Sequence, residues 1–253
     1  YFIISRSFGL NIGATIGIAL YLSQGISVAF YVIAFTEAFE FLFNYIAENY
    51  GFTLPRQAIS LPVMLGLAIL IIKKGANLGV KALYIVVGVL LVSLVMFFLG
   101  DTGHADATTF DLSKAELRNP QDFFVVFAII FPAFTGMTAG VGLSGDLKNP
   151  SKAIPLGTTL ATISGMIIYF FIIFKLAQSA PVEALLEEQL IMARIAVAGV
   201  IAIPLGLAAS TISSALGSVM VAPRTLQALA LDQAFPSKKL NGWLSKGTMK
   251  DNE

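Results

Sequence analysis

The chain has 253 residues, of which 57% are hydrophobic and only 12% charged, and its mean hydropathy is +0.83. Soluble domains carry about 25% charged residues, so this composition excludes a soluble enzyme, a disordered segment and a nucleic-acid-binding protein. A net charge of +1 implies no charge-driven partner. The absence of cysteine and the single histidine, His104, exclude a disulfide framework and a Cys or His metal cluster. A polytopic membrane protein remains.

Long uncharged stretches predict six membrane spans, because a bilayer core about 30 Å thick needs roughly 20 apolar residues per helix. We expect these spans, in chain order, at about 9–43, 57–74, 79–100, 121–146, 153–178 and 190–222. Together they make one partial transmembrane domain over 1–253, with 223–253 as a cytoplasmic extension. Tyr1 is not a start methionine and the first residues already read as membrane-proximal, so we expect a fragment of a longer chain.

The distribution of basic residues predicts the orientation of the chain in the membrane. Six spans place both ends on one side, and the segments on that side hold 11 of the 16 Lys and Arg residues. Basic residues accumulate on the cytoplasmic side, so we expect both ends to be cytoplasmic in a multi-pass protein of a plasma or cell membrane.

The fourth span carries the sequence FPAFTGMTAG at residues 131–140. Proline removes a backbone donor and glycine weakens a helix, so one Pro and two Gly near mid-membrane favour a broken helix. Backbone groups freed in hydrocarbon must be satisfied internally or by a ligand, and transporters use such breaks to bind ions. A simple proline kink packed against neighbouring helices is the alternative.

The sixth span carries five hydroxyl side chains in residues 210–218, STISSALGS. Hydroxyl and carbonyl oxygens suit a small hard cation, whereas small residues also allow close helix packing, and both interpretations stay open. In the first span Tyr31 is either an interface residue or a cation ligand. Glu37 and Glu40, near its end, face either the bundle interior or the outer interface.

Several of these motifs resemble the cation–chloride cotransporter family. They are FPAFTG at 131–136, SGDLKNP at 144–150, AIPLGT at 153–158, and SSAL at 213–216 followed by APR at 222–224 and QAL at 227–229. The resemblance implies the amino acid–polyamine–organocation superfamily, with an all-α membrane fold built on a five-plus-five inverted repeat that contains a discontinuous helix. It places the chain over the third to eighth helices of that family.

The resemblance also implies three ion sites, each completed by segments outside this chain. A potassium site would use Tyr31, the Pro132 carbonyl and Thr135. A chloride site would use the backbone N–H groups of Gly136, Met137 and Thr138, which open the second half-helix and so suit an anion. A sodium site would use Ser213, Ser214 and the carbonyl of Ser210.

Two residues depart from the family pattern. Phe134 and Ser210 stand where alanine is usual, and a ring at Phe134 would narrow the cation site. The pair Ser213 and Ser214 is absent from potassium–chloride members, so it favours a sodium-coupled member. Tyr31 favours including potassium, because the potassium-independent branch lacks this tyrosine.

The sequence therefore predicts a secondary active symporter that couples sodium and/or potassium to chloride by alternating access. We expect membrane lipid as a partner, and a homodimer is one assembly that the protein could form. No covalent chemistry, cofactor, nucleic acid or further metal is expected. An amino acid or amine permease of the same superfamily, a potassium–chloride cotransporter and a channel-like subunit stay open as alternatives. A membrane enzyme is the least favoured class, since the sequence shows no nucleophile–base or metal-ligand constellation.

Overall fold

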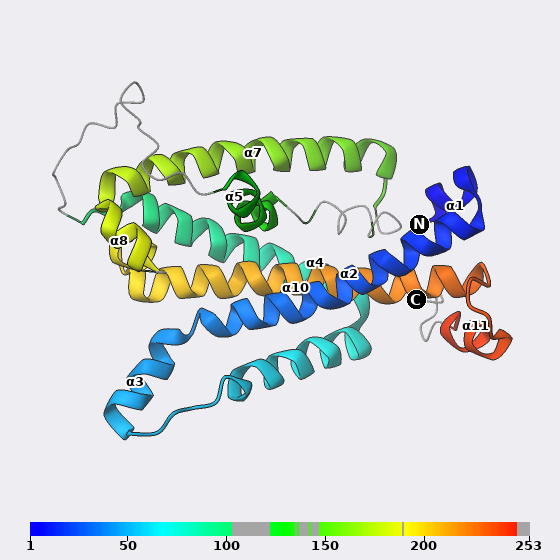
Figure 1. Cartoon of the computed structure of the whole chain (residues 1–253), viewed down its shortest axis with the longest axis horizontal. Coiled ribbons are helices and arrows are strands. Elements are labelled where there is room, and N and C mark those ends of the chain that lie inside the picture. The colour runs from blue at the N-terminus through cyan, green and yellow to red at the C-terminus, as the bar shows by residue number, and fades with distance from the viewer. Residues whose placement is uncertain (103–121, 135, 137–141, 143–146, 189, 247–253) are drawn as a thin grey trace. The chain divides into compact units, whose positions relative to one another are not determined.

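The computed structural model describes residues 1–102, 122–134, 136, 142, 147–188 and 190–246, the side chains of 72–82, 134 and 182 excepted (Figure 1). Every regular element in this part of the chain is a helix, as the composition predicts. The elements are α1 (Phe2–Phe8), α2 (Leu10–Glu37), α3 (Glu40–Tyr50), α4 (Gln57–Leu99), α5 (Phe123–Ile130), the 3₁₀ helix η2 (Phe131–Phe134), α7 (Pro150–Ser179), α8 (Val182–Glu187), α9 (Ile191–Ile195), α10 (Gly199–Leu231) and α11 (Lys238–Leu244).

Three of these helices, α2, α7 and α10, are long and apolar enough to cross a membrane. Shorter apolar helical stretches lie at Gln57–Ile71, Leu83–Leu99 and Phe123–Ala133. Each predicted span overlaps one of these six stretches. The second and third spans fall within the single element α4, so their separation stays a prediction.

Two predicted spans are interrupted near their ends. The first span extends past the end of α2 at Glu37 into a turn and the start of α3. The sixth span begins with the separate helix α9, and α10 follows after Ala198, whose φ of +48° is unusual for a residue with a side chain. At its other end α10 continues to Leu231, beyond the predicted limit of the span at 222.

The described residues form two compact units, and each is presented by itself. Unit 1 comprises Tyr1–Gly88 with Leu207–Glu253, and unit 2 comprises Val89–Gly206. In unit 1 the short helix α1 turns into α2 at Gly9, whose φ of +89° favours glycine. Gly13 of α2 then lies so close to α1 that a Cβ there would be only 2.6 Å from the Cα of Ser5.

Unit 1 also packs α2 against the end of α10, which runs beside it in Figure 1. A Cβ on Gly17 would lie 2.8 Å from the side chains of both Leu229 and Tyr1. Leu229 is fully buried. Small residues on α2 therefore allow the close contact between helices that membrane proteins use in place of a hydrophobic driving force.

Unit 2 has a small apolar core around Phe97, Ile195 and Ile203, with Ile172 and Leu176 of α7 packed against it. Polar contacts fix the helix ends around this core. Lys175 donates to the carbonyl of Gly100 at 2.6 Å, and the N–H of Val197 donates to the carbonyl of Met96 at 3.0 Å. Ser93 donates to the carbonyl of Ala202 at 2.8 Å. The last turns of α4 are thus joined to the first turns of α10 within this unit.

Candidate functional site

The fourth predicted span is discontinuous in the structure. The carboxylate of Asp122 accepts a hydrogen bond from the N–H of Phe124 at the start of α5, and the α-helix ends at Ile130. The backbone then tightens into the 3₁₀ helix η2, and Gly136 has a φ of +109°, which is outside helical geometry. Together α5 and η2 extend about 20 Å, less than the roughly 30 Å of a bilayer core. The predicted break is therefore present.

Tyr169 of α7 supports this break, and the sequence analysis did not identify it. Its hydroxyl donates to the carbonyl of Ala133 in η2 at 2.9 Å, within unit 2. A carbonyl released from the helical pattern needs such a partner in a membrane. The signal that could have revealed Tyr169 is its position as the one phenol in the apolar stretch 153–174.

The residues predicted for potassium and chloride fall in different parts of the chain. Tyr31 lies in α2 of unit 1, half-buried, with its ring edge against Phe30 at a centroid distance of 5.7 Å. Pro132 lies in η2 of unit 2, and the exposed Gly136 follows it. Thr135, Met137 and Thr138 lie outside the described residues. The structure thus gives the place of Tyr31, Pro132 and Gly136, while the ion sites themselves stay predictions.

The three serines predicted to bind sodium share one face of α10. Ser210, Ser213 and Ser214 are each half-buried, and their spacing of three and four residues places them on the same side of the helix. The hydroxyl of Ser214 donates to the carbonyl of Ser210 at 3.1 Å. Two of the oxygens predicted to bind sodium, the Ser214 hydroxyl and the Ser210 carbonyl, are therefore adjacent.

The two carboxylates near the end of the first span form a partly exposed cluster with Arg56. The guanidinium lies 3.8 Å from Glu37 and 3.9 Å from Glu40, beside a pocket of about 220 Å³ that Thr36 and Asn44 also line. All three charged side chains are more than a third exposed, so these ion pairs contribute little to stability. This arrangement favours the interface interpretation of Glu37 and Glu40. Among the described residues, no group of three His, Cys, Asp or Glu side chains could hold a metal ion.

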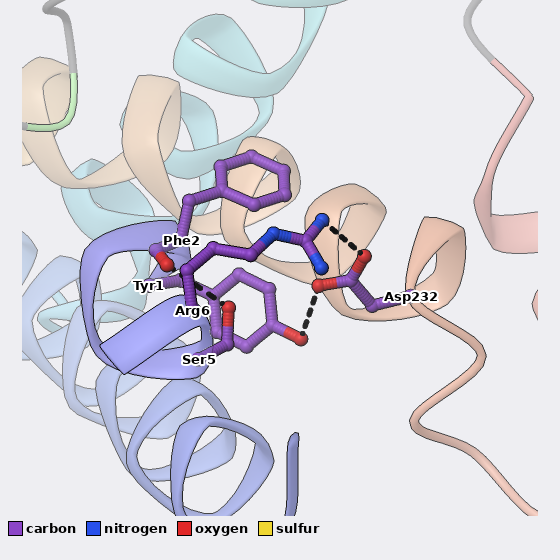
Figure 2. A network of polar contacts seen from close by, with 5 residues as sticks. All are labelled: Tyr1, Phe2, Ser5, Arg6 and Asp232. Atoms are coloured by element: carbon purple, nitrogen blue, oxygen red, sulfur yellow. Dashed lines mark hydrogen bonds and ion pairs between the residues drawn. The ribbon is translucent and has the colours of Figure 1, made fainter. Parts of the chain in front are cut away.

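A polar network that the sequence analysis missed joins α1 to the end of α10 (Figure 2). The carboxylate of Asp232 accepts a hydrogen bond from the hydroxyl of Tyr1 at 3.0 Å and pairs with the guanidinium of Arg6 at 3.1 Å. Figure 2 shows both side chains reaching the same carboxylate, while Ser5 bonds back to the carbonyl of Phe2 at 3.1 Å. Partial burial and the contact with Asp232 raise the pKa of the Tyr1 phenol.

Comparison with known proteins places the chain among membrane transporters. The family model described as amino acid permease matches residues 1–249. Solute carrier family 12 member 8 of Xenopus laevis is 33% identical over 96% of this chain and 34% of its own length. Member 2 of Squalus acanthias is 28% identical over the whole chain and 25% of its own length, and member 1 of Mus musculus is 26% identical over similar extents.

These matches confirm the predicted resemblance to the cation–chloride cotransporters, and the chain spans about a third or less of the length of these relatives. The match to a permease model and the similarity to solute carriers also place the chain in a family of transporters rather than of enzymes. With its all-helical architecture, its membrane-spanning helices and its broken fourth span, the chain belongs to the amino acid permease family of membrane transporters.

Proposed function

We propose that the whole protein is a secondary active symporter that moves sodium and/or potassium together with chloride across a membrane by alternating access. The observation that carries this proposal is the break between α5 and Gly136, because it frees backbone carbonyls and N–H groups at mid-membrane depth. Similarity to solute carrier family 12 members 1 and 2 over most of the chain supports the same function. Coupling arises because bound ions stabilise one access state more than the other.

Each ion has a chemically suitable set of groups in this proposal. The Tyr31 hydroxyl, the Pro132 carbonyl and Thr135 contribute to a potassium site, and hydroxyls and a carbonyl of Ser210, Ser213 and Ser214 contribute to a sodium site. These are the hard oxygen ligands that alkali cations prefer.

Chloride is held in the same proposal by the N–H groups of Gly136, Met137 and Thr138. The sequence predicts that a second half-helix begins at these residues, and its positive end would attract an anion. The remaining ligands of all three sites belong to parts of the protein outside this chain.

The proposed orientation follows from the basic residues and has both ends of the chain in the cytoplasm of a plasma or cell membrane. A homodimer is a further part of the proposal. Orientation is testable by reacting single cysteines with a membrane-impermeant thiol reagent in intact cells. The chain has no native cysteine, which gives this region a clean background.

The test of function is rubidium uptake by the whole protein in vesicles, with sodium and chloride each present or replaced. A sodium–potassium–chloride symporter requires both ions. The double variant Ser213→Ala and Ser214→Ala is expected to lose its sodium dependence or its activity, because two proposed ligands are removed. Ser218→Ala is the matched control, since Ser218 lies on the same helix one turn beyond the proposed site.

Uptake that requires chloride but not sodium would contradict the sodium site and indicate potassium–chloride transport, with the serines as packing residues. The absence of rubidium uptake would exclude potassium, and labelled sodium would then be tested. A second candidate function is amino acid or amine transport, favoured by the match to the amino acid permease model. In that case labelled amino acids, rather than rubidium, would be taken up.

A further inference from the structure

The chain leaves α10 through a tight turn that directs α11 back along α10. Gln233 has a φ of +54°, and its N–H and that of Ala234 donate to the carbonyls of Ala230 and Leu229, each at 3.0 Å. The side-chain amide of Gln227 then donates to the carbonyl of Ser245, at the far end of α11, at 3.4 Å. Figure 1 shows α11 beside the last turns of α10 rather than extending away from them.

This geometry sets the depth of α11 relative to the membrane. The sixth span is predicted to end at 222, and Gln227 lies five residues further, about 7–8 Å along the helix axis. The headgroup layer on each side of a bilayer is about 5–8 Å thick. Because Ser245 contacts Gln227, the end of α11 lies close to the level of the headgroups.

One side of α11 packs against the preceding turn of the chain. The side chain of Asn241 is buried, donates to the carbonyl of Phe235 at 2.7 Å and accepts from its N–H at 3.2 Å. Ser237 caps the helix by accepting from the N–H of Leu240 at 3.4 Å. These contacts fix α11 against the turn that precedes it, and the contact of Gln227 with Ser245 holds its far end against α10.

The side roughly opposite Asn241 presents apolar and basic residues. Trp243 is 71% exposed and Leu240 39% exposed, and their spacing of three residues places them together. Lys239 lies one turn before Trp243 on the same side, Lys238 begins the helix, and Lys246 follows its end. No Asp or Glu occurs between Gln233 and Lys246, so the whole segment is cationic.

We propose that α11 is a membrane-surface anchor that seats Trp243 and Leu240 at the boundary of the acyl chains and binds anionic lipid headgroups through Lys238, Lys239 and Lys246. Tryptophan favours the level of the headgroups, and lysine reaches from an apolar surface to phosphate. The pocket of about 240 Å³ between α11 and the end of α10, lined in part by Lys238 and Ser245, gives a headgroup room beside the helix. The proposal requires only that the chain spans a bilayer and does not depend on which ions it carries.

The test measures the environment of Trp243 in the whole protein reconstituted in vesicles. The spectrum of a Trp243→Phe variant is subtracted, so that only the emission of Trp243 remains. The vesicles contain phosphatidylcholine alone or mixed with phosphatidylserine. Phosphatidylcholine brominated on its acyl chains reports contact with lipid, and the uncharged quencher acrylamide reports contact with water.

With phosphatidylserine present, Trp243 is expected to be quenched by brominated lipid and shielded from acrylamide. Each lysine near an anionic surface strengthens attachment about fivefold, so changing all three to glutamine is expected to weaken docking of α11 about 100-fold. The quenching by brominated lipid should then fall to its level in phosphatidylcholine alone. Lys148→Gln with Lys152→Gln is the control, because it removes basic residues of another segment on the same predicted side.

Three results would overturn the proposal. Strong quenching by acrylamide that is equal with and without phosphatidylserine would mean that Trp243 faces water. Protection from both quenchers would mean that protein, such as an acidic segment of the same molecule, covers α11. Lipid quenching that persists in the lysine variant would mean apolar insertion without recognition of anionic headgroups. None of these measurements involves transport, so their outcome is independent of the proposed symport.

Discussion

Replacing Asp232 with alanine is expected to release α1 from the end of α10. This carboxylate holds both Tyr1 and Arg6, which come from the other end of the chain, at 3.0 and 3.1 Å (Figure 2). Its side chain is only 13% exposed, whereas that of Arg6 is 71% exposed. The two contacts therefore differ in strength, although they share one acceptor.

The structure gives the size of the effect. A hydrogen bond to a charged acceptor contributes about 1.5 kcal/mol at the lower end of its range, which suits the partly exposed phenol of Tyr1. The ion pair with Arg6 is screened by solvent and contributes about 0.5 kcal/mol. Asp232→Ala should thus lower the free energy needed to detach α1 by about 2 kcal/mol. This corresponds to about a 30-fold increase in the fraction of molecules in which α1 is detached. Tyr1→Phe should increase this detached fraction about tenfold, and Arg6→Gln should increase it about two- to threefold.

The assay is hydrogen exchange of the α1 amides in the reconstituted protein, with exchange in α7 as an internal reference. Glu48→Gln is the matched control, because Glu48 is an exposed acid of the same unit far from this network in the chain. The reasoning is refuted if exchange of α1 in Asp232→Ala stays within twofold of the unchanged protein. An effect of Arg6→Gln larger than that of Tyr1→Phe would refute the ranking of the two contacts.

The same network predicts a pH dependence. The pKa of the Tyr1 phenol is raised above its ordinary value of 10.0, so the folded state holds this proton more tightly than the unfolded state. Its contribution is fully present below about pH 10 and is lost as the pH rises through the raised pKa. After correction for the intrinsic pH dependence of exchange, the protection of α1 should be constant from pH 6 to 9 and fall in more alkaline solution. Tyr1→Phe should abolish that fall.

Two further predictions concern helix packing and the broken span. Gly13→Ala should destabilise the protein by about 1–3 kcal/mol in a thermal unfolding assay, because its Cβ would overlap α1. Gly25→Ala is the control in the same helix, because a Cβ at Gly25 would meet no neighbouring atom within 4 Å, and it should be neutral or stabilising by up to about 1 kcal/mol. Equal destabilisation by Gly13→Ala and Gly25→Ala would contradict this reasoning. Tyr169→Phe should reduce the rate of rubidium uptake, because the carbonyl of Ala133 loses the donor that helps to position η2. Tyr84→Phe, at a position 78% exposed, should leave the rate unchanged, and a loss confined to Tyr84→Phe would refute the role of Tyr169.

The helical character and the broken span could be predicted from the sequence, because both follow from local chemistry. A run of apolar residues can satisfy its backbone in a membrane only as a helix, whatever its neighbours are. Pro132 and Gly136 weaken a helix through their own backbone properties, and the structure shows η2 and a φ of +109° at these residues. The spacing of Ser210, Ser213 and Ser214 likewise determines that they share a face.

Contacts between distant segments were decided by the tertiary structure. Nothing local to Asp232 indicates that its partners are Tyr1 and Arg6, which lie 231 and 226 residues away. Tyr169 reads as an ordinary aromatic residue in an apolar helix until the carbonyl of Ala133 is found beside it. Composition and helical period depend on near neighbours along the chain, whereas the partner of a polar group depends on which helices pack together. The sequence alone therefore determined a membrane transporter with a broken helix. Packing within each unit, of α1 on the end of α10 and of α7 on η2, decided which polar groups are partners.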